Sequence, residues 1–368
     1  MRGNEVVAQA ALDGGCRAFF GYPITPQNQI PDYMARHMPE VGGVFLQAES
    51  EVSAINMVYG AASAGVRVMT ASSSPGISLK QEGISYIAEA ELPCVVVNIM
   101  RGGSGLGNIA PSQSDYFQAV KGGGHGDYRT LVLAAWSVQE LYDLTREAFE
   151  IADRYRGPVL ILGDALLGQM MEPVVLPAEV VDPATLPAKP WATTGAKGRP
   201  HNVINSLYIN PSDLEQSNLR LHARYQEAAD RELRFACERM EDAEYAVIAY
   251  GTAARVAVNA IDEARAAGIR AGLFRPISLF PFPTRQIAEL AGRVRGILVV
   301  ELSLGQMVED VRLAVEGRCP VRFLGRSGGI VITPDEMLAA VQALAGHSPA
   351  TASEDGSPCA QGRTRDGS

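Results

Sequence analysis

The chain has 368 residues, of which 47% are hydrophobic and 20% are charged, and its formal net charge is −9. This composition is globular rather than disordered, and the length predicts two domains and a tail. The negative charge argues against a nucleic acid partner, because phosphate binding uses a basic face. No apolar run is long enough to cross a membrane, and the N-terminus lacks the layout of a signal peptide. We therefore expect a cytoplasmic protein with no nucleic acid or membrane partner.

The first 170 residues alternate apolar, β-rich segments with amphipathic ones. Strands are expected at 16–22, 42–48, 66–72, 93–100 and 158–164, and helices at 4–14, 26–38, 50–63, 79–90 and 137–154. This alternation predicts a parallel sheet with helices on both faces. Since ligands bind at the carboxyl ends of strands in such sheets, the loops after these strands are the candidate site.

The pattern changes after this first unit. A Pro-rich segment without a clear period predicts a long connection, followed by a polar helix at about 212–240. A second α/β unit begins with a strand and an Ala-rich helix in 243–268. Further strands are expected in 269–283, 296–302 and 319–326, with helices near 284–292 and 306–315. We divide the chain into domains at 1–172, 173–240 and 241–345, with a disordered tail at 346–368.

The first candidate motif is Gly-Tyr-Pro-Ile-Thr-Pro, residues 21–26. Pro26 suits the first position of a helix, which places Thr25 at the N-cap, where its hydroxyl can bind a free backbone N–H. A helix start also attracts anions such as a carboxylate. An ordinary capped helix is the simpler interpretation of these residues alone.

Two acids, Glu49 and Glu51, follow the second expected strand and open a helix that is apolar nearly all round. A helix without a polar face is buried, and burial raises the pKa of a carboxyl group unless a partner offsets it. The alternative is that these acids only favour the helix dipole. One of the two glutamates could easily serve only the helix dipole, whereas it is less expected that both do.

Three further loops contain candidate residues. The Ser/Pro/Gly-rich segment 69–78 lets a ligand approach the backbone closely. Arg101 directly follows the most apolar strand and precedes glycines, so it could bind a carboxylate with paired hydrogen bonds. The following Gly-Gly-Ser-Gly-Leu-Gly is not a dinucleotide fingerprint, because no helix follows it directly. His125 lies in another glycine-rich loop and is either a general base, a phosphate contact or, more commonly, an ordinary loop residue.

The five cysteines, Cys16, Cys94, Cys237, Cys319 and Cys359, are far apart in the sequence. No two form a Cys-x-x-Cys pair, and the spacing fits neither a zinc site nor an iron–sulfur cluster held by this chain alone. We expect reduced, scattered thiols. Any redox cluster that serves this protein should therefore lie on a partner.

Taken together, the motifs resemble a known family. GYPITP, ESE at 49–51, SSSPG, and MRGGSGLG followed by SQSD occur in this order in the α-type subunit of the thiamine-dependent 2-oxoacid:ferredoxin oxidoreductases. The resemblance covers residues 3–345. The segments LQAESEVSAINMVYGAA, ISLKQEGISYIAEAELPCV, KGGGHGDYR and WATTGAKGRPHNVINSLYI look most like the 2-oxoisovalerate (3-methyl-2-oxobutanoate) members.

The resemblance implies a thiamin-diphosphate-binding fold, here the pyrimidine domain, followed by a transketolase C-terminal-like α/β domain. It implies oxidative decarboxylation of a 2-oxo acid with CoA to acyl-CoA and CO₂, which reduces ferredoxin. Thiamine diphosphate would be shared with a β-type partner subunit that holds the diphosphate and Mg²⁺. A ferredoxin-like subunit would carry the [4Fe-4S] clusters.

The same resemblance implies roles for individual residues. Glu51 matches the catalytic glutamate that contacts the aminopyrimidine ring nitrogen of thiamine, and Thr25 and Arg101 match positions that hold the substrate carboxylate. Pro23 and Ser74 are expected to contact the cofactor. Glu49 keeps the dipole interpretation, and we assign no role to His125, to the 173–240 connection or to the tail.

One departure and three alternatives stay open at this stage. The chain has no diphosphate-and-metal motif, because LGDALLG at 162–168 lacks the context and the Asn, so the chain alone should be inactive. The chain could instead belong to a 2-oxoglutarate:ferredoxin oxidoreductase or form half of a non-oxidative thiamine-dependent carboligase. As a non-catalytic scaffold subunit, it would tolerate the loss of Glu51 and Arg101.

Overall fold

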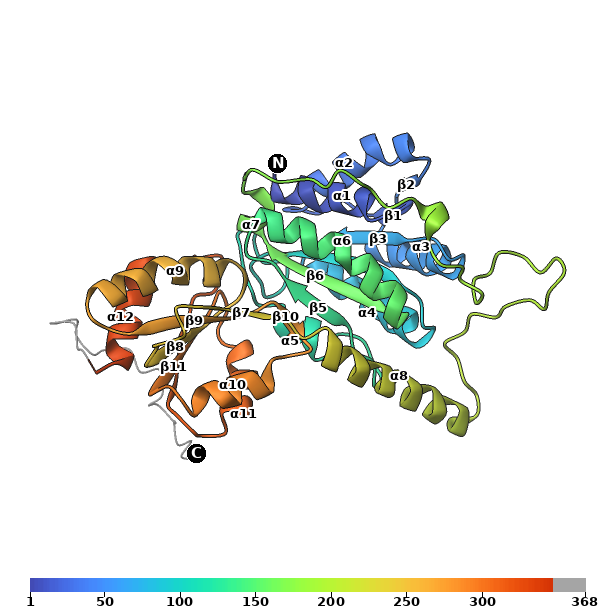
Figure 1. Ribbon diagram of the computed structural model, residues 1–368. Coiled ribbons are helices and arrows are strands. Elements are labelled where there is room, and N and C mark those ends of the chain that lie inside the picture. The colour runs from blue at the N-terminus through green and yellow to red at the C-terminus, as the bar shows by residue number, and fades with distance from the viewer. Residues whose placement is uncertain (347–368) are drawn as a thin grey trace, which may run out of the picture.

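The computed structural model describes residues 1–346 and consists of two α/β units built on separate sheets (Figure 1). The disordered tail expected from the sequence lies, from residue 347 on, outside the described residues, as does Cys359. The first unit contains α1 (Gly3–Asp13), β1 (Ala18–Gly21), α2 (Gln29–His37), β2 (Val44–Gln47), α3 (Glu51–Ser63), β3 (Val68–Ser72), α4 (Pro75–Glu89), β4 (Cys94–Met100), α5 (Tyr116–Val120), β5 (Leu131–Ala134), α6 (Val138–Tyr155), β6 (Pro158–Asp164) and α7 (Ala165–Gln169).

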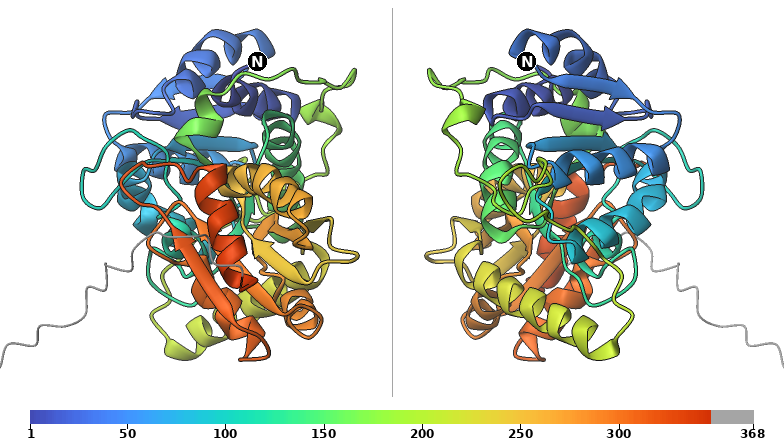
Figure 2. Two further views of the ribbon diagram at one scale, coloured as in Figure 1. Left: turned by 90° about the vertical axis from the view of Figure 1, so that its left-hand side faces the viewer. Right: turned by 90° about the vertical axis from the view of Figure 1, so that its right-hand side faces the viewer.

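The first sheet has seven strands in the order β10-β5-β6-β4-β3-β1-β2, and all are parallel except β10 (Ser278–Phe280). Successive side chains of each buried strand point to opposite faces of the sheet, so the hydrophobic core is divided into two layers. Val95 and Val97 pack with α1, α2 and α6 on one face, whereas Cys94 and Val96 pack with α3, α4 and α5 on the other. Figure 2 shows the sheet between these two helical layers. The expected doubly covered parallel sheet is confirmed.

The second unit contains α8 (Pro211–Arg231), β7 (Phe235–Glu238), β8 (Tyr245–Ile248), α9 (Gly251–Ala266), β9 (Ala271–Pro276), α10 (Thr284–Ala291), β11 (Gly296–Glu301), α11 (Met307–Val315), β12 (Val321–Gly325) and α12 (Pro334–Leu344). Its sheet has the order β12-β11-β8-β9-β7, with β7 antiparallel at one edge. Helices α9 and α12 pack on one face of this sheet, and α10 and α11 pack on the other.

The structure corrects several sequence expectations in this region. The helix expected at 212–240 ends at Arg231, and residues 235–238 form β7, which pairs with β9. The segment 269–283 was expected to serve only the second unit, but its residues 278–280 cross back and pair with β5 of the first sheet. Strand β5 and helix α12 were not expected. Strands this short depend on pairing with distant residues rather than on a strong local pattern.

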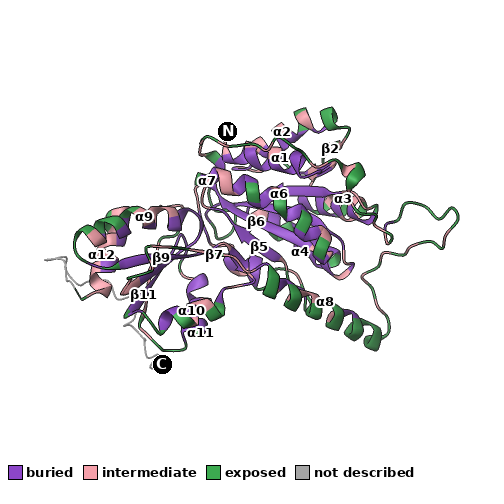
Figure 3. Ribbon diagram, viewed as in Figure 1, coloured by how far each residue is buried: buried purple, intermediate pink, exposed green. Residues whose placement is uncertain are grey.

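The long connection between α7 and α8 was expected and is observed, with one short 3₁₀ helix at Pro183–Thr185. It crosses the surface of the first unit and extends away from the body before α8 (Figure 1). Two backbone hydrogen bonds anchor it to helix ends: Val181 N–H to the Asp13 carbonyl and Thr193 N–H to the Ser63 carbonyl, each 2.8 Å. Helix α8 is largely exposed along its length (Figure 3).

The SQSD segment, residues 112–115, joins the two units. The buried Gln113 side chain donates to the Tyr250 carbonyl at 2.8 Å and accepts from the Leu302 N–H at 2.9 Å. The backbone N–H of Gln113 donates to the Leu302 carbonyl at 2.8 Å. Nearby, Arg275 pairs with Glu140 through two 2.8 Å contacts. The second unit is therefore fixed against the carboxyl-end loops of the first sheet.

Four cysteines are free thiols, as expected: Cys16 and Cys94 are buried, Cys319 is half-buried and Cys237 is exposed. Within residues 1–346, no group of three or more His, Cys, Asp or Glu side chains is placed to hold a metal ion. None of the helices described here is long and apolar enough to span a membrane.

Candidate active site

The turn at residues 22–28, after β1, differs from the capped helix expected from the sequence. Helix α2 begins at Gln29, not at Pro26, and Thr25 is not its N-cap. The Pro26 carbonyl, which would accept a backbone hydrogen bond in the first turn of the expected helix, instead accepts from the side chains of Asn4 at 2.7 Å and Gln169 at 2.9 Å. These side chains come from α1 and α7. The turn therefore differs from the expected helix start because of tertiary contacts, which the local sequence does not encode.

Arg101 follows β4 and is buried beside this turn, with 8% of its surface exposed. Its Nη1 donates to the Thr25 carbonyl at 2.9 Å, and its Nη2 donates to the Leu106 carbonyl at 2.9 Å. The Nε has no partner among the described residues. Because a guanidinium has five N–H donors, it is held in place here with donors to spare. This geometry is suited to binding a carboxylate.

Ser74 stands at the centre of a buried hydrogen-bond network. Its hydroxyl accepts from the Arg101 N–H at 3.0 Å and donates to the Asp115 carboxylate at 2.6 Å. Asn98 also donates to Asp115, at 2.9 Å, and its side-chain oxygen accepts from the Ser74 N–H at 3.0 Å. Burial raises the pKa of the Asp115 carboxyl, whereas these hydrogen bonds oppose the rise. Ser74 has a φ of +24°, an uncommon value for a residue with a side chain.

Glu51 is the first residue of α3, and only 6% of its surface is exposed. The N-cap of α3 is Ser50, whose Oγ accepts from the Ser53 N–H at 3.2 Å. Glu49 is exposed, and a hydrogen bond from the Ser53 hydroxyl lowers the pKa of its carboxyl. The two acids therefore differ in environment: Glu49 lies at the solvent side of the helix start and Glu51 in its buried side.

Helix α3 is not buried all round, contrary to the expectation. Val52, with 42% of its surface exposed, Asn56 and Gly60 form an exposed stripe at i, i+4 and i+8. No other part of residues 1–346 covers this stripe.

Gly76, in the first turn of α4, packs directly against Glu51. A Cβ at Gly76 would lie 2.7 Å from the Glu51 Oε1 and would clash with the Ser72 hydroxyl. The Ser72 and Ser73 hydroxyls are buried without a hydrogen-bond partner among the described residues. The glycine of SSSPG thus allows a close approach of α4 to the Glu51 carboxylate, with polar atoms beside it.

The structure therefore brings Thr25, Glu51, Ser74 and Arg101 to one edge of the first sheet. They follow β1, β2, β3 and β4, which are neighbouring parallel strands. Pro23 also lies in the turn after β1 but is exposed. No role was expected for Asp115, Asn98 and Lys80, although SQSD and the Lys of ISLKQEGI were visible in the sequence.

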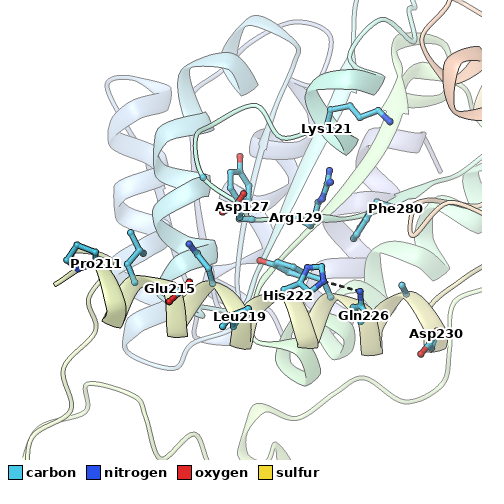
Figure 4. Close-up of a pocket in the computed structure, with 16 residues that line it drawn as sticks. Lys121, Asp127, Arg129, Pro211, Glu215, Leu219, His222, Gln226, Asp230 and Phe280 are labelled. Atoms are coloured by element: carbon cyan, nitrogen blue, oxygen red, sulfur yellow. Dashed lines mark hydrogen bonds between the residues drawn. The ribbon is translucent and has the colours of Figure 1, made fainter. Parts of the chain in front are cut away.

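A hollow lies away from this edge. It has a volume of about 900 Å³ between the loop 121–129 and helix α8, and Lys121, Arg129 and His222 are among the side chains that line it (Figure 4). None of the four candidate residues at the sheet edge lines it, and His125 does not line it either. His125 is exposed and lies edge-on to the Tyr86 ring, with 6.4 Å between ring centroids, which fits an ordinary loop residue.

Comparison with protein families places these residues in context. Residues 9–241 match the family described as "pyruvate flavodoxin/ferredoxin oxidoreductase, thiamine diP-bdg", and residues 243–337 match "pyruvate:ferredoxin oxidoreductase core domain II". The chain belongs to the 2-oxoacid:ferredoxin oxidoreductase family. It is a subunit of this enzyme class, and residues 9–241 match its thiamine-diphosphate-binding region.

Several curated members of this family are similar along nearly their whole length. The chain is 50% identical over 348 residues to the ketoisovalerate oxidoreductase subunit VorB of Methanothermobacter marburgensis, which covers 95% of this chain and 98% of that protein. It is 37% identical over 363 residues to the 2-oxoglutarate synthase subunit KorA of the same organism, which covers 92% and 96%.

Solved structures agree with this assignment. A 2-oxoglutarate:ferredoxin oxidoreductase from Magnetococcus marinus superimposes with a TM-score of 0.79 at 25% identity, and the match covers 94% of the present chain and 64% of the solved one. An inactive β4 tetramer of a split-gene transketolase superimposes with a TM-score of 0.62 at 14% identity, which shows the shared fold alone. The expected fold class and family are thus confirmed.

Proposed function

We propose that this chain is the pyrimidine-binding subunit of a 2-oxoisovalerate:ferredoxin oxidoreductase. The complete enzyme would convert the 2-oxo acid and CoA to acyl-CoA and CO₂ and pass two electrons to ferredoxin. The observation that carries this proposal is the Glu51 carboxylate, buried against Gly76 at the sheet edge that also holds Arg101. The higher identity to the ketoisovalerate enzyme than to the 2-oxoglutarate enzyme supports the substrate.

The residues present fit the pyrimidine half of thiamine diphosphate. Gly76 leaves room beside Glu51 that a Cβ would fill, and the Ser72 and Ser73 hydroxyls are free to bind a polar ring. When bound, this cofactor supplies the carbanion that attacks the 2-oxo group and accepts the electrons of decarboxylation. Glu51 would exchange a proton with the aminopyrimidine ring nitrogen. A carboxyl group in a site shielded from water is suited to this transfer. Ser74 and Pro23 would contact the cofactor from the neighbouring loops.

Arg101 would bind the substrate carboxylate and offset its charge until CO₂ leaves. Its two hydrogen bonds to the Thr25 and Leu106 carbonyls fix the guanidinium before the substrate arrives, so less ordering is needed at binding. The Thr25 hydroxyl accepts from the Asn28 side chain at 3.1 Å, which leaves its own O–H group to donate to the substrate.

We further propose that a β-type partner covers this edge and supplies the diphosphate and Mg²⁺ site, while a ferredoxin-like subunit carries [4Fe-4S] clusters. Five exposed apolar side chains lie within eight residues, along the chain, of Thr25, Glu51, Ser74 or Arg101: Tyr22, Val52, Leu79, Leu106 and Ile109. Apolar side chains exposed in the segments that carry the site would suit a protein interface. An enzyme that uses ferredoxin and CoA would work in the cytoplasm, so we propose the cytoplasm as the location of this protein.

The decisive experiment is reconstitution with the partner subunits. We expect 2-oxoisovalerate- and CoA-dependent reduction of ferredoxin, and near-complete loss of that activity in Glu51→Gln with assembly and fold intact. A preference for 2-oxoglutarate would overturn the substrate. Carboligase activity without ferredoxin reduction, or full activity of Glu51→Gln, would overturn the oxidoreductase role.

The interface is tested separately by Val52→Glu, which should weaken assembly with the partner. Leu313→Glu is the matched control, because Leu313 is 69% exposed on α11 of the second unit. Equal assembly of both variants would contradict the placement of the partner at the sheet edge.

A further inference from the structure

Lys80 lies within α4 and is completely buried, with none of its surface exposed. Its Nζ donates to the Thr70 Oγ1 at 2.6 Å and to the Ala71 carbonyl at 3.3 Å. The Thr70 hydroxyl in turn donates to the Phe20 carbonyl at 2.6 Å. The direct partners of the ammonium are thus neutral oxygens, although burying an ammonium without a paired charge is costly.

The composition makes this lysine unusual. The chain has four lysines against 28 arginines, and the other three lysines, at 121, 189 and 197, are exposed or half-buried. Arg67, by contrast, is a buried cation with charged partners, because it contacts Glu150 and Asp153 at 2.8 Å each. An arginine stays charged at every accessible pH, whereas a buried lysine can lose its proton. Position 80 therefore holds the kind of cation whose charge can change.

Lys80 and Gly76 are four residues apart and lie on the same face of α4, so the lysine follows one turn after the glycine that packs on Glu51. Burial lowers the pKa of Lys80 to about 7, and the attraction of the Glu51 carboxylate opposes that fall. The two side chains are therefore coupled across the α3–α4 contact.

Other charged groups near α4 are engaged elsewhere. Helix α8 presents Arg220 and Arg224, which pair with Glu91 beyond the C-terminal end of α4. Strand β6 ends in Asp164, whose carboxylate caps α7. The face that β3 turns to Lys80 provides hydroxyl and carbonyl groups. Glu51 is thus the charged group that acts on Lys80 from the packed elements.

We propose that Lys80 is a positioning residue for Glu51: buried one turn beyond Gly76, its protonated ammonium attracts the Glu51 carboxylate and keeps it in place, and this attraction is lost when Lys80 loses its proton. This inference rests on the proposed function, in which Glu51 exchanges a proton with the cofactor. Charge coupling of this kind is strong in a site from which water is excluded. Lys80 would thereby set the alkaline limit of the reaction without touching substrate or cofactor.

The first test measures the coupling without turnover. The full chain, labelled with ¹³C at the lysine Cε and assembled with unlabelled partners, gives four lysine signals, and the other three lysines serve as internal references. We expect Lys80 to titrate near pH 7 in the wild type and at a lower pH in Glu51→Gln, because the attraction of the carboxylate is lost. Equal Lys80 midpoints in the two proteins would overturn the proposal, whatever the activity of the complex.

The second test follows kcat/KM against pH. The wild type should lose activity as Lys80 deprotonates, whereas Lys80→Met should be less active at neutral pH and lack that alkaline loss. Lys80→Arg, which keeps its charge, should restore activity above the midpoint. Lys189→Met is the matched control, because it removes an ion pair with Asp153 away from the site. A wild-type pH profile in Lys80→Met would overturn the proposal.

Stability gives a readout independent of activity. Because the pKa of Lys80 is lowered from 10.5 to about 7 in the folded chain, the unfolded chain binds more protons between these values. Wild-type stability should therefore rise with pH in this window, and Lys80→Met should lack the rise. If Lys80→Met does not fold, the Glu51→Gln titration still decides the question. If the wild-type complex does not reduce ferredoxin, the proposed function is overturned. The effect of Glu51 on the Lys80 titration would still stand.

Discussion

Gly76→Ala tests whether the close approach of α4 to Glu51 is essential. The added Cβ would lie 2.7 Å from the Glu51 Oε1 and closer still to the Ser72 hydroxyl. Both contacts are shorter than the packing limit, so the carboxylate or the first turn of α4 must move. Overpacking of a well-packed contact costs about 1–3 kcal/mol, and a displacement of roughly 1 Å at a reacting group can cost about 10²-fold in rate.

We therefore expect Gly76→Ala to fold with a lower Tm and to reduce ferredoxin at least about 100-fold more slowly at saturating 2-oxo acid. Gly83→Ala is the matched control for overpacking, because its Cβ would meet Ile55 between the same two helices without reaching the carboxylate. It should lower Tm comparably and affect the turnover rate far less. Gly292→Ala, whose Cβ would meet only the Glu289 carbonyl at 3.6 Å, should be neutral.

Either of two outcomes would refute this role of Gly76. If Gly76→Ala kept the wild-type turnover rate while losing stability, the contact with Glu51 would be a packing feature alone. If Gly76→Ala and Gly83→Ala lost equal activity, the effect would come from helix displacement rather than from the carboxylate.

Three further predictions follow from the same structure. Arg101→Ala should lower kcat/KM for the 2-oxo acid by about 10- to 100-fold through the loss of charge-assisted hydrogen bonds, and unchanged steady-state kinetics would exclude the carboxylate role. Because burial raises the pKa of Asp115 above 3.8, the unfolded chain releases this proton first as the pH rises, so folding stability should fall with rising pH above 3.8. Asp115→Asn should remove this dependence in denaturation curves measured at several pH values. Gln113→Met should cost about 1–3 kcal/mol in denaturant unfolding, because it leaves the Tyr250 carbonyl and Leu302 N–H without partners, whereas the half-buried Gln118→Met should cost less than about 1 kcal/mol.

The sequence predicted the parts of the fold that local patterns encode. The strands at 93–100 and 158–164 are continuous apolar runs, and both are fully buried in the centre of the sheet. The apolar run of β5, LVLA, is only four residues long, and the three-residue β10 pairs with it from more than 140 residues away in the sequence. Strand β7 was not predicted because its pairing partner is also elsewhere in the sequence and because its residues follow a polar helix.

The candidate site shows the same division. Residues at strand ends, such as Glu51 and Arg101, could be found from the order of the elements. Thr25 was placed in the wrong local structure because Asn4 and Gln169, far away in the sequence, bind the Pro26 carbonyl. Asp115 could not be assigned because its partners are distant in the sequence: Ser74 precedes α4, and Asn98 lies in β4.

Strand β10 has a consequence for how the protein can be made and divided. The first sheet stays one edge strand short until the ribosome has completed residue 280, long after its other strands have left the exit tunnel. A chain cut between the two family regions, near residue 242, would leave the hydrogen-bonding groups of β5 open to other chains. The thiamine-binding half should therefore aggregate when expressed alone.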